Sequence, residues 1–158
     1  MLDLQSKPWI DIYYSSSDDL RLHARHYPAP DERFRSVICL AGLTRKSRDF
    51  HALATHLSNH PETPRNVYCI DYRGRGQSEF DPNWRNYMPN VELDDVLDFL
   101  TIQGLHQVGI VGTSRGGIVT MLMAAARPTA MGPVVLNDIC LLYTSPSPRD
   151  QRPNLVCR

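Results

Sequence analysis

A serine lies between two glycines in the stretch 112–116, which reads Gly-Thr-Ser-Arg-Gly. The pattern Gly-x-Ser-x-Gly carries nucleophilic catalysis when the serine occupies a sharp turn from a strand into a helix, because a strained backbone corner then presents its hydroxyl. Glycine on each side leaves room for the adjoining strand and helix. The helix N-terminus behind Ser114 would favour developing negative charge. The pattern predicts Ser114 as a nucleophile, and an ordinary strand-to-helix turn is the alternative interpretation.

The residues on either side of Ser114 supply the strand and the helix that such a turn needs. The apolar run 108–111 predicts the end of a buried strand, and the apolar stretch 118–126 suits a helix. We expect the helix to end before Pro128, which cannot continue it.

The rest of the chain alternates short apolar runs with segments of helical periodicity. We expect an antiparallel hairpin from Trp9–Tyr14 and Leu20–Tyr27, because both segments have a β-like composition and partial alternation. Beyond the hairpin, the order predicts an α/β fold with a mostly parallel sheet and helices on both faces. The expected strands are Val37–Leu40, Val67–Ile70, His106–Val111 and Val134–Leu136, and the expected helices are Ser47–Leu57, Val91–Leu100 and Arg115–Arg127.

Two details of the expected helices can be checked against a structure. Ser47 is a plausible N-cap for the first of them. The helix 91–100 carries acidic residues mostly opposite its apolar positions, and we expect these to form a solvated face: Glu92, Asp94, Asp95 and Asp98.

The amino-acid composition limits the classes of function that the chain can have. The 158 residues carry 17 basic and 17 acidic side chains, a formal net charge of zero, so nothing favours nucleic acid or an anionic membrane as a partner.

No N-terminal leader and no apolar run of transmembrane length is seen, which favours a cytoplasmic location. The four cysteines lack Cys-x-x-Cys spacing and suit small buried apolar residues, so we expect no metal site. The turn at 71–78 lacks the third glycine of a dinucleotide fingerprint, and no cofactor is implied.

The composition changes at Cys140. Residues 140–158 hold three prolines and no helical period, and a DNA sequence resembling the transposase adapter of short-read libraries would encode most of them. Our hypothesis is that residues 1–139 are the N-terminal part of a domain and that 140–158 are translated adapter; a disordered linker is the alternative.

Four features occur in the same order as in a known family: the hairpin, the Ala41-Gly42-Leu43 turn, the Asp-Tyr-Arg-Gly-Arg-Gly-Gln-Ser turn at 71–78, and the corner at Ser114. From about residue 9 to 138 the chain resembles the α/β-hydrolase family. One departure is Ala41, where the family commonly has histidine; it bears on the rigidity of that loop.

The resemblance implies a role for several residues. Ser114 would be the nucleophile, and the backbone N–H groups of Arg115 and Leu43 would form the oxyanion hole. The family order places the acid and the histidine after the nucleophile, whereas all six histidines of this chain precede Ser114, so none is assigned as the base. Asp138 is a possible acid, with a helix cap or loop stabiliser as its alternative role. The Arg115 side chain could bind an acidic substrate group or be solvated.

The resemblance therefore implies a serine hydrolase that acts on an ester-like acyl substrate through an acyl-enzyme, without metal or cofactor. We expect the present chain to be inactive, because a serine hydroxyl needs a base within hydrogen-bond reach. The alternatives are a non-catalytic binding protein for a small ligand on the same fold, and an acyltransferase or perhydrolase.

Overall fold

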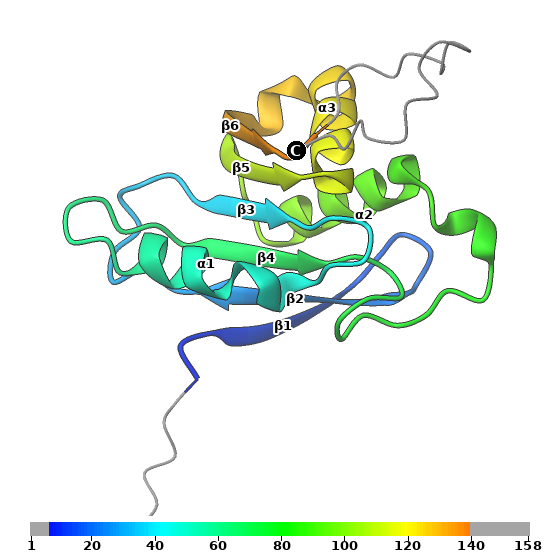
Figure 1. Ribbon diagram of the computed structural model, residues 1–158, viewed down its shortest axis with the longest axis horizontal. Helices are drawn as coiled ribbons and strands as arrows, with labels where there is room; N and C mark the ends of the chain where they lie inside the picture. Colours follow the sequence, from blue (N-terminus) through cyan, green and yellow to red (C-terminus); the bar gives the residue numbers. More distant parts are fainter. Residues whose placement is uncertain (1–6, 140–158) are drawn as a thin grey trace, which may run out of the picture.

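A six-stranded mixed sheet forms the centre of the computed structural model, which describes residues 7–139 (Figure 1). Its strand order is β1-β2-β4-β3-β5-β6. β1 and β2 form an antiparallel hairpin and β2 pairs antiparallel with β4, while the β4–β3, β3–β5 and β5–β6 pairs are parallel. The strands are β1 (Ile10–Ser15), β2 (Arg21–Tyr27), β3 (Val37–Leu40), β4 (Val67–Asp71), β5 (Val108–Thr113) and β6 (Met131–Asn137).

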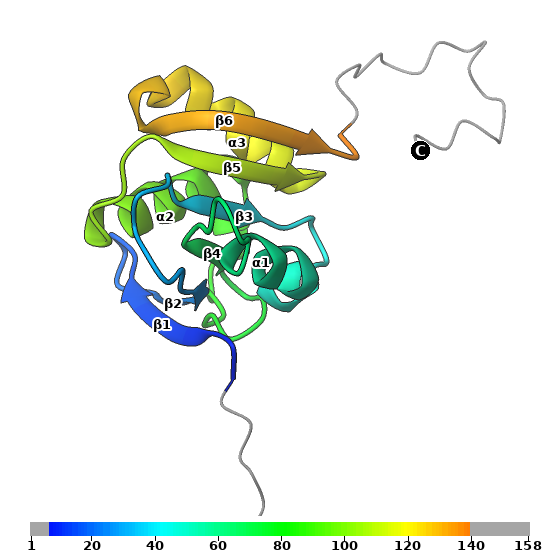
Figure 2. The same cartoon turned by 90° about the vertical axis from the view of Figure 1, so that its left-hand side faces the viewer.

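Helices cover both faces of this sheet. Helix α1 (His51–Ser58) lies on one face, and α2 (Pro89–Ile102) and α3 (Arg115–Ala126) lie on the other (Figures 1 and 2). The mostly parallel sheet with an N-terminal hairpin and helices on both faces is therefore confirmed, with element ends shifted by a few residues from those expected.

Strand β3 shows how the sequence fills both layers. Its four residues are all buried, and alternate side chains point to opposite faces of the sheet. Ile38 and Leu40 join the core under α2 and α3, whereas Val37 and Cys39 join the core under α1. A strand buried on both faces explains why β3 is continuously apolar.

The start of the first helical segment differs from the expectation. The segment begins as a 3-10 helix over Ser47–Phe50 with Lys46 as its N-cap, so the predicted N-cap at Ser47 is wrong. Ser47 is buried, and its backbone N–H donates to the carboxylate of Asp71, 2.6 Å away at the end of β4. The N–H of Lys46 binds the carboxylate of Asp49 within the same turn, and the N–H of Ser47, at the first helical position, takes its acceptor from β4.

The predicted solvated face of α2 is also wrong for two of its four acids. Glu92 and Asp95 are fully buried, and each pairs with an arginine from another element. Asp94 is exposed, as expected for that face.

Two further sequence expectations concern cysteines and membrane spans. Cys39 and Cys69 are buried free thiols, whereas Cys140, Cys157 and the proposed foreign segment lie outside the described residues. Within residues 7–139, no helix combines the length and apolarity needed to cross a bilayer.

Candidate active site

Ser114 occupies the corner between β5 and α3. Its backbone has φ 50° and ψ −112°, a left-handed conformation that costs energy for a residue with a side chain. The residue is exposed and makes no side-chain capping hydrogen bond to α3, although it stands at the N-cap position. Its carbonyl instead accepts the N–H of Gly117, which starts the helix. The hydroxyl is thus presented at the surface of a strained corner.

Two close approaches explain the glycines of the motif. A Cβ on Gly112 would lie 2.8 Å from the carbonyl oxygen of Gly116 and 2.6 Å from the Thr120 hydroxyl. A Cβ on Gly116 would lie 2.0 Å from the carbonyl oxygen of Leu40. Real Cβ atoms do not approach backbone so closely, so both positions need glycine to bring β5, α3 and β3 together around Ser114.

The loop that follows β3 lies beside Ser114. A Cβ on Gly42 would be only 3.6 Å from the Ser114 Cβ, so the peptide joining Gly42 and Leu43 passes next to the corner. The N–H of Arg45 donates to the Gly42 carbonyl at 3.0 Å and holds this peptide in a turn. Among residues 7–139, the N–H groups of Leu43 and Arg115 have no hydrogen-bond acceptor. Both N–H groups are therefore unpaired within this range, as the predicted oxyanion-hole role requires.

The Arg115 side chain has a different role from either of those expected. Its Nε donates to Glu92 at 2.6 Å, and its Nη2 donates to the carbonyl oxygen of Tyr87 at 2.8 Å. The side chain is only 16% exposed, and its Nε and Nη2 donate to protein partners in place of water or an acidic substrate group. The sequence suggested no partner because Glu92 lies 23 residues earlier, on α2.

The turn after β4, residues 71–78, is held by a buried ion network. Arg73 is 1% exposed and binds Asp95 through two hydrogen bonds of 2.9 and 2.6 Å. Its Nη1 also donates to Asp18 and Asp81. These carboxylates raise the pKa of Arg73 above its usual value, Asp95 contributing most and burial opposing it. The guanidinium thereby joins the β1–β2 turn, α2 and the long connection before α2.

Asp71 anchors the other side of the same turn. Its carboxylate binds the ring of His23 at 2.7 Å and accepts the N–H groups of Ser47 and Gln77. Burial opposes ionisation of Asp71, but these hydrogen bonds outweigh it and hold the pKa of the carboxyl below its usual value of 3.8. The carboxylate thus connects the β3–α1 loop to the turn at 71–78.

Asp138 directly follows β6 at the edge of the site. The carbonyl of its neighbour Asn137 accepts the N–H of Ser114 at 3.0 Å, so the end of β6 lies against the corner. Asp138 is exposed and has φ 50°, a conformation that aspartate adopts more readily than most residues. The backbone of Asp138 therefore lies next to the corner, and within residues 7–139 its carboxylate makes no hydrogen bond to Ser114.

Four histidines use ring nitrogens in contacts away from Ser114. His23 binds Asp71 and Asp11, His26 binds Asn66, His51 binds the Tyr27 hydroxyl, and His60 binds Thr63. In the described part of the chain, no group of three or more His, Cys, Asp or Glu side chains could hold a metal ion.

A cavity of about 420 Å³ adjoins the corner on the α1 side of the sheet. Gly42 and Thr113 line it next to Ser114, and its walls are largely apolar; among them are Phe50, Leu53, Val111 and Val135. Such walls suit an apolar ligand group.

Comparisons with known proteins agree with this architecture. Residues 35–155 match the α/β hydrolase fold family. The chain is 30% identical over 105 residues to 3-hydroxybutyrate-oligomer hydrolase from Cupriavidus necator and 35% identical over 118 residues to lipase LipV from Mycobacterium tuberculosis. The crystal structure of an α/β hydrolase from Novosphingobium aromaticivorans superposes with a TM-score of 0.78 at 40% identity.

The chain spans less than half the length of these proteins. The alignments cover 66% and 74% of the chain but 34% and 41% of the two curated relatives, and the superposition covers 85% of the chain and 46% of the crystal structure. The family match continues past residue 139, so the division of the chain at that residue stays a prediction.

Proposed function

The chain belongs to the α/β hydrolase fold family, and on that premise we propose that it is the N-terminal part of a serine hydrolase that cleaves ester-like acyl substrates. The relatives named as a hydrolase and a lipase support a hydrolase-type function. The observation that carries the finer proposal is the exposed Ser114 in its left-handed corner, with two unused backbone N–H groups beside it.

The proposed reaction passes through an acyl-enzyme. The Ser114 Oγ attacks the ester carbonyl carbon while its proton passes to a base, and the N–H groups of Leu43 and Arg115 bind the oxygen that becomes negative. The carbon–oxygen bond to the alcohol then breaks, and the alcohol takes the proton from the base. Water, deprotonated by the base, then attacks the carbonyl carbon of the acyl-enzyme. The bond from that carbon to the Ser114 Oγ breaks, the Oγ takes back the proton, and the carboxylic acid is released. Substrate would enter as a small acyl compound; nucleic acid and membrane partners form no part of the proposal.

The base is proposed to come from a later part of the gene product. Since every histidine of this chain precedes Ser114 and four of them are bound elsewhere, the present chain should lack activity. A chromogenic ester tests this directly: turnover by the chain that disappears in Ser114→Ala would contradict the missing base.

The nucleophile is tested in the polypeptide encoded by the uninterrupted gene. A fluorophosphonate probe, which reacts with activated serines, should label the protein, and Ser114→Ala should abolish both labelling and ester turnover. Ser17→Ala changes an exposed serine in the β1–β2 turn and serves as the matched control. A non-catalytic binding protein would not react with the probe, and full labelling of Ser114→Ala would exclude Ser114 as the nucleophile.

The role of Asp138 is decided in the same polypeptide. An acid that orients the base is worth about 10⁴-fold in kcat. A comparable loss in Asp138→Asn would assign that role to Asp138, whereas a loss below about threefold would assign a loop-stabilising role.

A further inference from the structure

Glu92 lies fully buried in the first turn of α2, between Arg75 from the turn after β4 and Arg115 at the first position of α3. Its Oε2 accepts the Nε of Arg115 at 2.6 Å, and its Oε1 lies 3.7 Å from Nη1 of Arg75. The side chains of Arg115 and Arg75 are only 16% and 19% exposed. One carboxylate thus lies between two partly desolvated positive charges.

Each arginine is connected to one of the two N–H donors of the proposed oxyanion hole. Arg115 itself carries the first N–H. Arg75 donates its Nε to the carbonyl oxygen of Leu43, whose own N–H is the second donor, and donates its Nη1 to the carbonyl of Arg73 at 3.3 Å. The peptide before Leu43 is fixed by the bond from Arg45 to Gly42, and the peptide after it by Arg75. Arg75 and Glu92 therefore connect the loop after β3 to the start of α3 through side chains.

We infer that Glu92 and Arg75 are positioning residues that fix the distance and orientation between the two N–H groups of the oxyanion hole. The inference rests on the proposed function, because the spacing of the two N–H groups matters only if they form an oxyanion hole. Such donors stabilise the transition state only when they lie about 3 Å from the oxygen. A small displacement of one loop therefore lengthens a hydrogen bond and lowers kcat.

Charge explains why a carboxylate is needed at this position. Without it, the guanidinium groups of Arg75 and Arg115 would repel each other in a partly buried setting, where screening by water is weak. Glu92→Gln keeps the size of the side chain and removes the charge that holds both groups. The Leu43 loop and the first turn of α3 then lose their shared anchor.

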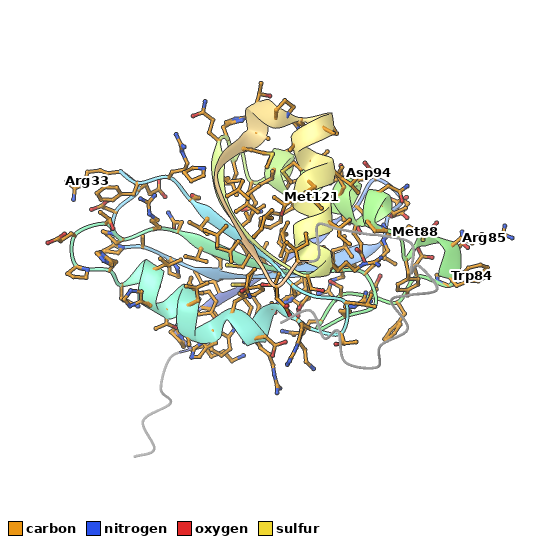
Figure 3. All side chains as sticks on the ribbon, turned by 45° about the horizontal axis from the view of Figure 1, so that its top comes forward. Arg33, Trp84, Arg85, Met88, Asp94 and Met121 are labelled. Atoms are coloured by element: carbon orange, nitrogen blue, oxygen red, sulfur yellow. The ribbon has the colours of Figure 1, made fainter. Side chains whose placement is uncertain are left out.

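The experiment compares variants of the polypeptide encoded by the uninterrupted gene. Glu92→Gln and Arg75→Gln are measured beside two controls that remove the same charges from exposed positions, Asp94→Asn on α2 and Arg85→Gln, both labelled in Figure 3. Titration with the fluorophosphonate probe counts the active sites, so that rates refer to correctly folded protein alone.

The expected result is a loss in kcat per active site of about 10- to 100-fold in both test variants, with KM within about threefold, because the oxyanion hole acts on the transition state. The double variant should lose no more than either single variant, since both changes break one connection. The two controls should stay within about twofold of the wild type.

Three outcomes separate the inference from its alternatives. Wild-type kcat per active site in both test variants would overturn it, even if their melting temperatures fall. Losses that multiply in the double variant would also overturn it, because the two residues would then act independently. If the wild type is not labelled at Ser114, the proposed function and the inference both fail. Should Glu92→Gln not fold, Arg75→Gln carries the test alone, since its side chain is partly exposed.

Discussion

Gly116 packs directly against Leu40: a Cβ on Gly116 would lie 2.0 Å from the Leu40 carbonyl oxygen and 2.5 Å from its carbonyl carbon. The contact joins the first turn of α3 to the end of β3, the strand beside β5. It sets how closely the helix approaches the sheet, and thereby where the N-terminus of α3 lies relative to Ser114.

Gly116→Ala should therefore destabilise the protein strongly. The obstructing atoms are backbone, which cannot move away as a flexible side chain can, so we expect a loss of about 3 kcal/mol in the free energy of unfolding. Gly104→Ala is a matched control. Gly104 has φ 62° but open space around its Cα, so its substitution should cost about 1 kcal/mol from backbone strain alone. Urea denaturation measures both, and equal losses would contradict the steric argument.

Removal of Arg73 should cost more than removal of its exposed partner. Arg73→Ala leaves Asp95, a buried carboxylate, without its two hydrogen bonds, and breaking such a pair costs about 3–5 kcal/mol. Asp18 is 44% exposed, so Asp18→Asn should cost about 1 kcal/mol or less. Denaturation midpoints provide the comparison. An Arg73→Ala variant as stable as Asp18→Asn would show that the buried Arg73–Asp95 pair contributes no more to stability than the exposed Asp18 contact.

Features that depend on neighbouring residues could be predicted from the sequence, and those that depend on distant partners could not. The corner at Ser114 was foreseen because a strand, two glycines and a helix stand together in the chain. The buried positions of Glu92 and Asp95 were missed, since an amphipathic pattern places acids toward water unless an arginine from another element pairs with them. The N-cap prediction at Ser47 missed by one residue, because the segment begins as a 3-10 helix capped at Lys46, and the Asp71 carboxylate that binds the Ser47 N–H lies 24 residues later.

Asp71 gives the protein a predictable weakness at acid pH. Its pKa in the folded state lies below the usual 3.8, so its hydrogen bonds contribute full stability above that value and lose it as the pH falls through the lower folded pKa. The free energy of unfolding should decline as the pH is lowered below about 4, as monitored by urea denaturation at each pH. Asp71→Asn should be less stable at neutral pH and show a shallower decline. Asp94→Asn, an exposed control, should keep the wild-type slope.

The last prediction concerns β6, which lies at the edge of the described sheet and carries exposed apolar side chains. Val134, Val135 and Leu136 are 40%, 58% and 38% exposed, and Val135 lines two adjoining cavities between the sheet and α1. Because an apolar strand with one unpaired edge within residues 7–139 can pair with another chain, we expect this polypeptide to self-associate.

Light scattering during size-exclusion chromatography measures the association. Val135→Lys places a charge on the exposed face of β6 and should shift the chain toward monomer. Phe80→Lys removes an even more exposed apolar side chain from a loop, 79% exposed, and should leave the association unchanged, because that loop offers no strand edge. A wild-type chain that is monomeric and melts in one sharp transition would contradict the prediction. An equal effect of both variants would assign the association to general apolar exposure and not to the edge of β6.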